Sequence, residues 1–200
     1  MVSSLFLFLL EMNNIIEKIR IFVEDECKKP TSLYGYEPFL CHFTPVVMYA
    51  KQLADQFWWD KEVIEIAGWL HDIGSIIYGR EDHHITGAKI AGEKLVELNY
   101  PVEKIELIKK CILHHRGSKE FVRESIEEKI IAEADVMGAF TNLSGLFKAA
   151  FIYEHLDQEQ AEISVRKKLE NKRNQLSFLE SKELVRSKYE SAMILLNNWF

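Results

Sequence analysis

The stretch Ile66-Ala67-Gly68-Trp69-Leu70-His71-Asp72-Ile73-Gly74 decides the fold. Its apolar first half indicates a short buried helix, which we predict to end at the His71–Asp72 pair. Neighbouring side chains of a regular helix diverge by about 100°, so both residues can bind one metal ion only where the backbone leaves helical geometry. We expect Gly74 to supply that departure as a helix-ending glycine.

The chain on both sides of this stretch has the helical period, without sustained alternation of apolar and polar residues. Helices are expected over residues 15–23, about 42–57, 63–70, 88–98, 105–112, 126–137, 158–173 and 178–196. Loops are expected over residues 30–41 and 75–84. Ser125 with Glu128, and Ser177 with Glu180, fit capping boxes at two helix starts. The predicted fold class is all-α, a compact multi-helix bundle with additional C-terminal helices.

A chain of 200 residues suits one domain. It should bury about 70% of its unfolded surface, enough to fold without disulfides or a structural metal. We expect a single helical domain over residues 12–200, with a core at about 35–150 and C-terminal helices over 158–198. Residues 1–11 are expected to be disordered or an upstream extension, because Met12 opens the amphipathic segment.

Charge, cysteine content and hydrophobicity indicate which partners and which compartment suit the chain. The net charge of −6 argues against a nucleic-acid polymer, whose binders usually carry a basic face. Three cysteines without paired spacing, Cys27, Cys41 and Cys111, suit the reducing cytoplasm. The apolar run Leu5–Leu10 is too short to span a bilayer and lacks a basic leader. We therefore expect a cytoplasmic protein that binds no membrane.

Histidines and aspartates form an ordered series along the chain. All histidines except His155 lie within the first 115 residues, each at an expected helix edge or in the loop beside it. The series runs His42, His71–Asp72, His83–His84, His114–His115 and Asp135. Imidazole and carboxylate together suit divalent ions such as Zn, Fe, Mn, Ni and Mg. One His-Asp pair arises often by chance, so the prediction of a metal site depends on the joint pattern.

Asp135 lies at the edge of the apolar stripe of its predicted helix, four residues after Ile131. A carboxylate that faces a core needs a cation or a full set of hydrogen-bond donors. No Lys or Arg stands at helical spacing on that side, since Lys129 is six residues back. A metal ion would satisfy Asp135; a buried ion pair with a distant residue is the alternative.

Four segments carry a resemblance to a known family: Ala67–Gly74, His84–Ala91, Cys111–His115 and Ile131–Asp135. The succession H…HD…H…H…D over about residues 35–150 resembles the HD-domain superfamily of metal-dependent phosphohydrolases. Relatives often have Asp-Ala-Asp where this chain has Glu133-Ala134-Asp135. That departure keeps the final aspartate and changes what surrounds it.

The resemblance implies one or two divalent ions, from among Mn, Fe, Mg, Zn and Ni, as the cofactor. The metal ligands that it implies are His42, His71, Asp72, His84, His115 and Asp135. Asp72 would bridge the two ions. His83 is the alternative to His84, and His114 is the alternative to His115.

The implied reaction is hydrolysis of a nucleotide or other small phosphate ester by a metal-activated hydroxide. The candidate catalytic and phosphate-binding residues are Asp72, Arg80, Lys89, Arg116 and Lys119. Two alternatives stay open: a di-iron oxygenase, as some relatives are, and a non-catalytic metal-containing domain that senses a nucleotide or binds a partner. The charged C-terminal helices could cover the site or pair subunits into a homodimer.

Overall fold

The computed structural model describes residues 4–57, 59–117 and 121–197, and these form helices and turns with no strand among them. The elements are α1 (Ser4–Lys28), a π-helical turn η1 (Phe39–Phe43), α2 (Thr44–Phe57), α3 (Lys61–Leu70), α4 (Ile73–Tyr78), α5 (His83–Glu97), α6 (Val102–His114), α7 (Ile126–Gly138), a 3-10 turn η2 (Ala139–Thr141), α8 (Leu143–Ile152), α9 (Gln158–Gln175) and α10 (Leu179–Asn197). The all-α prediction is confirmed.

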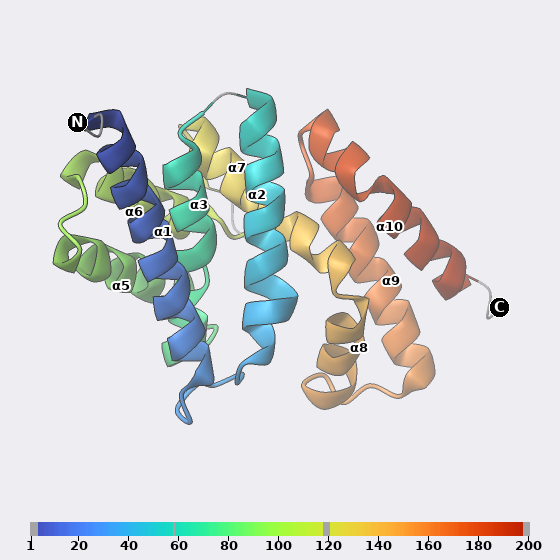
Figure 1. Ribbon diagram of the computed structural model, residues 1–200. Coiled ribbons are helices and arrows are strands. Elements are labelled where there is room, and N and C mark those ends of the chain that lie inside the picture. The colour runs from blue at the N-terminus through green and yellow to red at the C-terminus, as the bar shows by residue number, and fades with distance from the viewer. Residues whose placement is uncertain (1–3, 58, 118–120, 198–200) are drawn as a thin grey trace.

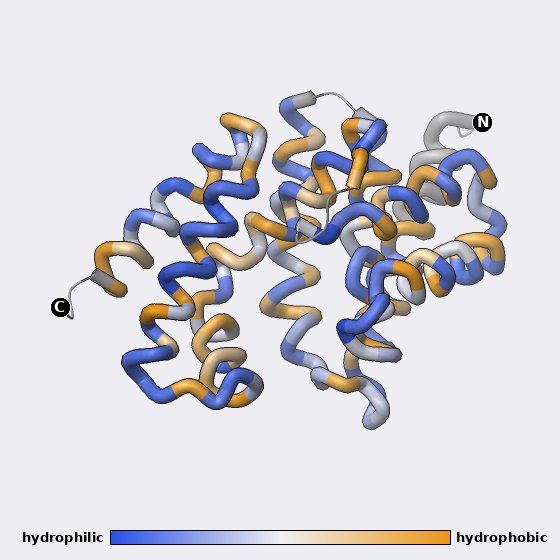
Figure 2. The backbone as a smooth tube through the Cα atoms, turned by 180° about the vertical axis from the view of Figure 1, so that it is seen from behind, coloured by the Kyte–Doolittle hydropathy of each residue, from blue (hydrophilic) through white to orange (hydrophobic). Residues whose placement is uncertain are grey.

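The helix α2 lies at the centre of the arrangement (Figure 1). On one side it packs against α3, and α1 and α6 in turn pack against α3. On another it packs against α7, the helix that α9 and α10 also contact. The C-terminal helices α8, α9 and α10 form a separate layer beside α2, as both ribbon and tube views show (Figures 1 and 2).

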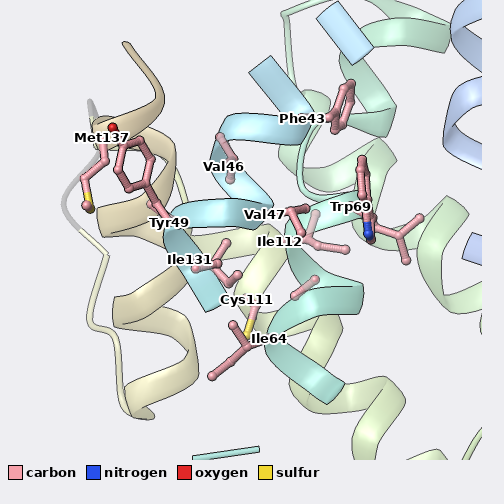
Figure 3. Packing of buried hydrophobic residues seen from close by; sticks show 14 of the residues in the cluster. Phe43, Val46, Val47, Tyr49, Ile64, Trp69, Cys111, Ile112, Ile131 and Met137 are labelled. Carbon is pink, nitrogen blue, oxygen red and sulfur yellow. The ribbon is translucent and has the colours of Figure 1, made fainter. Parts of the chain in front are cut away.

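The core is built around both sides of α2. Figure 3 shows side chains of several helices gathered in this core: Val46, Val47 and Tyr49 from α2, Ile64 and Trp69 from α3, Cys111 and Ile112 from α6, and Ile131 and Met137 from α7. Burial of each large aliphatic side chain stabilises the fold by about 1.5–3 kcal/mol. Because α2 is held from both sides, the turn η1 that precedes it also has a fixed position.

Side-chain caps define where the helices begin. The Asp60 side chain accepts a hydrogen bond from the amide of Val63 at the start of α3. The capping box predicted for Ser125 and Glu128 is confirmed at the start of α7. Ser177 acts differently from the predicted box: its amide and its hydroxyl both donate to Glu133 Oε1, at 2.6 and 2.7 Å. This link ties the α9–α10 connection to α7.

The structure bears on two expectations for local structure. The predicted loop over residues 75–84 begins only after Tyr78, because Ile73 and Ile76 bury one side of the short helix α4. Residues 1–11, expected to be disordered or an upstream extension, contain the start of α1 at Ser4, and residues 1–3 lie outside the described residues. None of the helices that the structure describes combines the length and apolarity needed to cross a membrane.

Gly74 has a different role from the predicted helix-ending glycine. It lies inside α4, and the described glycines with positive φ are Gly35 and Gly79. The backbone leaves helical geometry at Asp72 instead, with φ −113° and ψ 13°. A Cβ on Gly74 would lie 2.2 Å from the carbonyl oxygen of His83 and 2.5 Å from Thr86 Oγ1. Glycine is therefore required because α5 begins directly against α4.

We predict that Gly74→Ala lowers the free energy of unfolding by about 3 kcal/mol or more, since the clash is with backbone and must separate α4 from α5. Chemical denaturation measures the change. Gly92→Ala in α5 is the matched control: its new Cβ meets only the flexible side chain of Lys109, and alanine favours a helix interior by about 0.5–1 kcal/mol. Equal stability of the two variants would contradict the close-approach role of Gly74.

Candidate metal centre

Side chains from five parts of the chain converge at one end of the bundle. They come from η1 (His42), the junction of α3 and α4 (His71 and Asp72), the first residue of α5 (His83), the residue after α6 (His115), and α7 (Asp135). Two groups have ligand atoms that all lie within 4.8 Å of one another: His42, His71 and Asp72, and then Asp72, His83 and His115. Asp72 belongs to both groups.

The first group also has Asp135 beside it. His42 Nε2 lies 3.0 Å from His71 Nε2 and 3.1 Å from Asp72 Oδ2. Asp135 Oδ1 lies 3.6 Å from His42 Nε2 and 3.9 Å from His71 Nε2. Two nitrogens bound to one ion at about 2.1 Å are about 3.0–3.4 Å apart for octahedral to tetrahedral angles. The donor spacing therefore fits a single divalent ion.

The second group uses the other oxygen of Asp72. Asp72 Oδ1 lies 3.1 Å from His83 Nε2 and 3.5 Å from His115 Nε2, and the two imidazole nitrogens are 3.3 Å apart. Because Oδ2 faces the first group and Oδ1 faces the second, the Asp72 carboxylate lies between two cation-sized positions.

Backbone carbonyls fix the tautomer of three imidazoles. His71 Nδ1 donates to Gly68 O at 2.8 Å, His83 Nδ1 to Arg80 O at 2.7 Å, and His115 Nδ1 to Ile112 O at 2.6 Å. A carbonyl oxygen only accepts, so Nδ1 must carry the proton in each ring. The Nε2 lone pair of each neutral ring then points into the cluster, as in histidines that bind metals.

The close approach of two imidazole nitrogens shows whether these residues suit a metal ion. Because Nδ1 of each ring donates to a carbonyl, the Nε2 atoms of His83 and His115, which are 3.3 Å apart, can form a hydrogen bond only if one of them carries an added proton. Two carboxylates, Asp72 and Asp135, lie among these rings. A cation between the lone pairs and the carboxylates relieves both repulsions, so the donor set fits divalent metal ions.

Protons on the imidazole rings are a second source of positive charge for the cluster. Burial lowers the pKa of His71 to about 4, so this ring is neutral at pH 7 and suited to bind a metal. Burial also lowers the pKa of His42 and of His115, but the Asp72 carboxylate outweighs it and raises both above the ordinary value. Metal ions would therefore displace protons from this site.

The structure places His83, the alternative to His84, in the cluster. His83 reaches the cluster, whereas the ring of His84 lies near Phe121, with centroids 5.9 Å apart. His115 reaches the cluster as expected. Its alternative, His114, instead contacts Glu128, with Nδ1 2.6 Å from the carboxylate. The structure thus brings together His42, His71, Asp72, His83, His115 and Asp135.

A cavity of about 960 Å³ opens over the cluster, and several expected cations lie on its wall. Arg80 and Arg116 line it. Lys89 is not among the lining residues; its exposed side chain lies 4.0 Å from Glu93 on α5. The structure thus places Lys89 away from the cavity lining, and Lys119 lies outside the described residues.

The C-terminal helix α9 forms one wall of the same cavity through Lys168, Asn171, Lys172 and Gln175. Sequence reasoning missed Lys172, because the lysine that approaches Asp135 comes from another helix and not from helical spacing along α7. Burial raises the pKa of Asp135, but the positive charges of Lys172 and His42 hold it below its ordinary value. The C-terminal helix α9 thus borders the site, and a role of these helices in pairing subunits stays a prediction.

Comparisons with known proteins connect this geometry to a family. The HD domain model matches residues 39–139. The solved structure of an HD-superfamily hydrolase from Bacillus thuringiensis superposes with a TM-score of 0.73 at 17% identity, over 94% of this chain and 96% of that one. Bacillus subtilis YpgQ in complex with ADP gives 0.73 at 17% identity, over 92% and 93%. Both likenesses concern the fold.

A curated relative shares part of its length with this chain. The tRNA (cytidine(56)-2'-O)-methyltransferase of Picrophilus torridus is 26% identical over an alignment of 140 residues, and the match covers 63% of this chain and 39% of that protein. The HD domain match spans half of the chain and includes every residue of the cluster. The chain therefore belongs to the HD-domain family.

Proposed function

We propose that the protein is a divalent-metal-dependent phosphohydrolase that acts on a nucleotide or another small phosphate ester. The observation that carries the proposal is the shared Asp72 carboxylate, with one oxygen toward each of two histidine pairs at the wall of the large cavity. A pair of adjacent divalent ions is a recurrent arrangement in enzymes that hydrolyse phosphate esters.

A nucleotide is favoured as the substrate for two reasons. The related fold of Bacillus subtilis YpgQ has been solved in complex with ADP. The cavity here, about 960 Å³, is within the usual size range of small-molecule sites. Tyr34 and Tyr153 line it together with the cations, so both an aromatic base and a phosphate would find complementary groups.

Each residue of the site has a defined part in the proposed reaction. Divalent ions held by the His and Asp cluster would lower the pKa of an attacking water and offset negative charge on the phosphoryl oxygens. Asp72 would hold the two ions at a fixed separation. The carbonyl hydrogen bonds to Nδ1 of His71, His83 and His115 keep these rings oriented before substrate arrives. Arg80 and Arg116 would orient the phosphate from the cavity wall.

Two other functions use the same residues and give different measurements. A di-iron oxygenase would contain iron, would be coloured, and would consume oxygen during turnover. A nucleotide-sensing domain would bind a nucleotide with metals present and would not hydrolyse it. Metal analysis with a hydrolysis screen over nucleotides, cyclic nucleotides and phosphomonoesters separates all three.

We predict that Asp72→Ala loses bound divalent metal and lowers metal-dependent hydrolysis by at least about 100-fold, because both ion positions lose a ligand. Elemental analysis of purified protein measures the first effect, and the hydrolysis screen measures the second. Asp25→Ala, at an exposed position of α1, is the control and should keep both properties. A fully active Asp72→Ala protein would exclude the bridging role.

The geometry makes a second prediction, which separates two neighbouring histidines. His83→Ala should lose one of two metal ions per chain, because only His83 points at Asp72 and His115. His84→Ala should keep its metal content and lose some stability, since His84 is buried outside the cluster. Elemental analysis and thermal unfolding of both proteins test this; loss of metal from His84→Ala alone would reverse the assignment.

A further inference from the structure

We infer that Lys172 of α9 binds the phosphate of the substrate, so that the C-terminal helices supply part of the substrate site. This inference rests on the proposed function, since it assumes that a phosphate compound enters the cavity. Lys172 stands outside the histidine and aspartate series and outside residues 39–139 that match the HD domain.

The pattern of α9 is the first support. Its buried stripe runs through Ala161, Val165 and Leu169, with spacings of four residues. Lys168 and Lys172 lie beside this stripe, are half-buried and line the cavity. A half-buried lysine costs free energy unless it meets an anion or water. The edge of α9 that borders the cavity therefore carries positive charge.

The ion pairs of the cavity lysines are the second support. Three lysines line the cavity, and two of them have carboxylate partners on its wall: Lys148 with Glu37, and Lys168 with Glu154. Across the described part of the chain, no carboxylate lies within the 4.0 Å ion-pair distance of Lys172. Its charge is therefore available to a ligand.

The neighbourhood of Asp135 shows which ligand would suit Lys172. Lys172 and Asp135 line the same cavity, and their side chains are farther apart than an ion pair. Divalent ions in the cluster would neutralise Asp135 and leave Lys172 facing positive charge, together with Arg80 and Arg116 on the same wall. An anion with several oxygens, such as phosphate, can bridge these groups and offset their repulsion.

Glu133 holds α9 in the position that this role requires. The Ser177 amide and hydroxyl donate to Glu133, two residues before Asp135 on α7, and Ser177 follows the last residue of α9 by two positions. The link therefore fixes the end of α9 relative to Asp135. Lys172 lies within the last turn and a half of that helix.

Calorimetric titration of inorganic phosphate and of ADP into the metal-loaded protein tests the inference. We expect Lys172→Met to raise the Kd for both by about tenfold and to raise KM more than it lowers kcat, because one charged contact is lost. Lys172→Arg should restore binding to within about threefold. Lys167→Met, an exposed lysine of the same helix outside the cavity, should bind as the wild type does.

Metal content and thermal unfolding of each variant separate phosphate binding from a purely structural role. Lys172→Met with unchanged metal content and weaker phosphate binding supports the inference. Unchanged phosphate binding overturns it, as does an effect that Lys167→Met shares. A wild-type protein that binds neither phosphate nor ADP also overturns it. Lys172-dependent binding of ADP without any hydrolysis would sustain the inference and reject the proposed phosphohydrolase.

Discussion

Imidazole nitrogens that face one another at 3.3 Å, beside carboxylates, are the constraint on which the site depends. Such a cluster is stable only with positive charge in it, and burial makes the requirement stronger. The fold brings these side chains together by placing them at the ends of helices. Asp72, His83 and His115 each stand at the edge of a helix, where side chains can converge without breaking a hydrogen-bond ladder.

The helical period predicted most elements because each amphipathic helix buries a face of its own. It missed α8 and also α4, whose six residues are too few to show a period. The interpretation of Gly74 was wrong because its contact with α5 is tertiary. The meeting of His71, Asp72 and Asp135 was predictable from residue types and helix edges. The choice of His83 over His84 was not, since two adjacent residues at a helix start point about 100° apart and no local signal sets that rotation.

The role of the C-terminal helices could be predicted only as a pair of alternatives. Their charged surface suits either a cover for the site or a subunit contact, and the choice depends on which helix α9 packs against. In the structure α9 packs against α7, and the hydrogen bonds from Ser177 to the Glu133 carboxylate hold the end of α9 there. The Glu133 side chain thus reaches the loop between α9 and α10.

The wide spacing of the ligands along the chain links cation binding to the whole folding equilibrium. His42 and Asp135 meet only when α2 and α7 have packed, so an unfolded chain offers no comparable site. An ion that binds the folded form alone, at one hundred times its Kd, would add about 2.7 kcal/mol to the stability. Chelators would then act as mild denaturants of the bundle, although its apolar core is complete without metal.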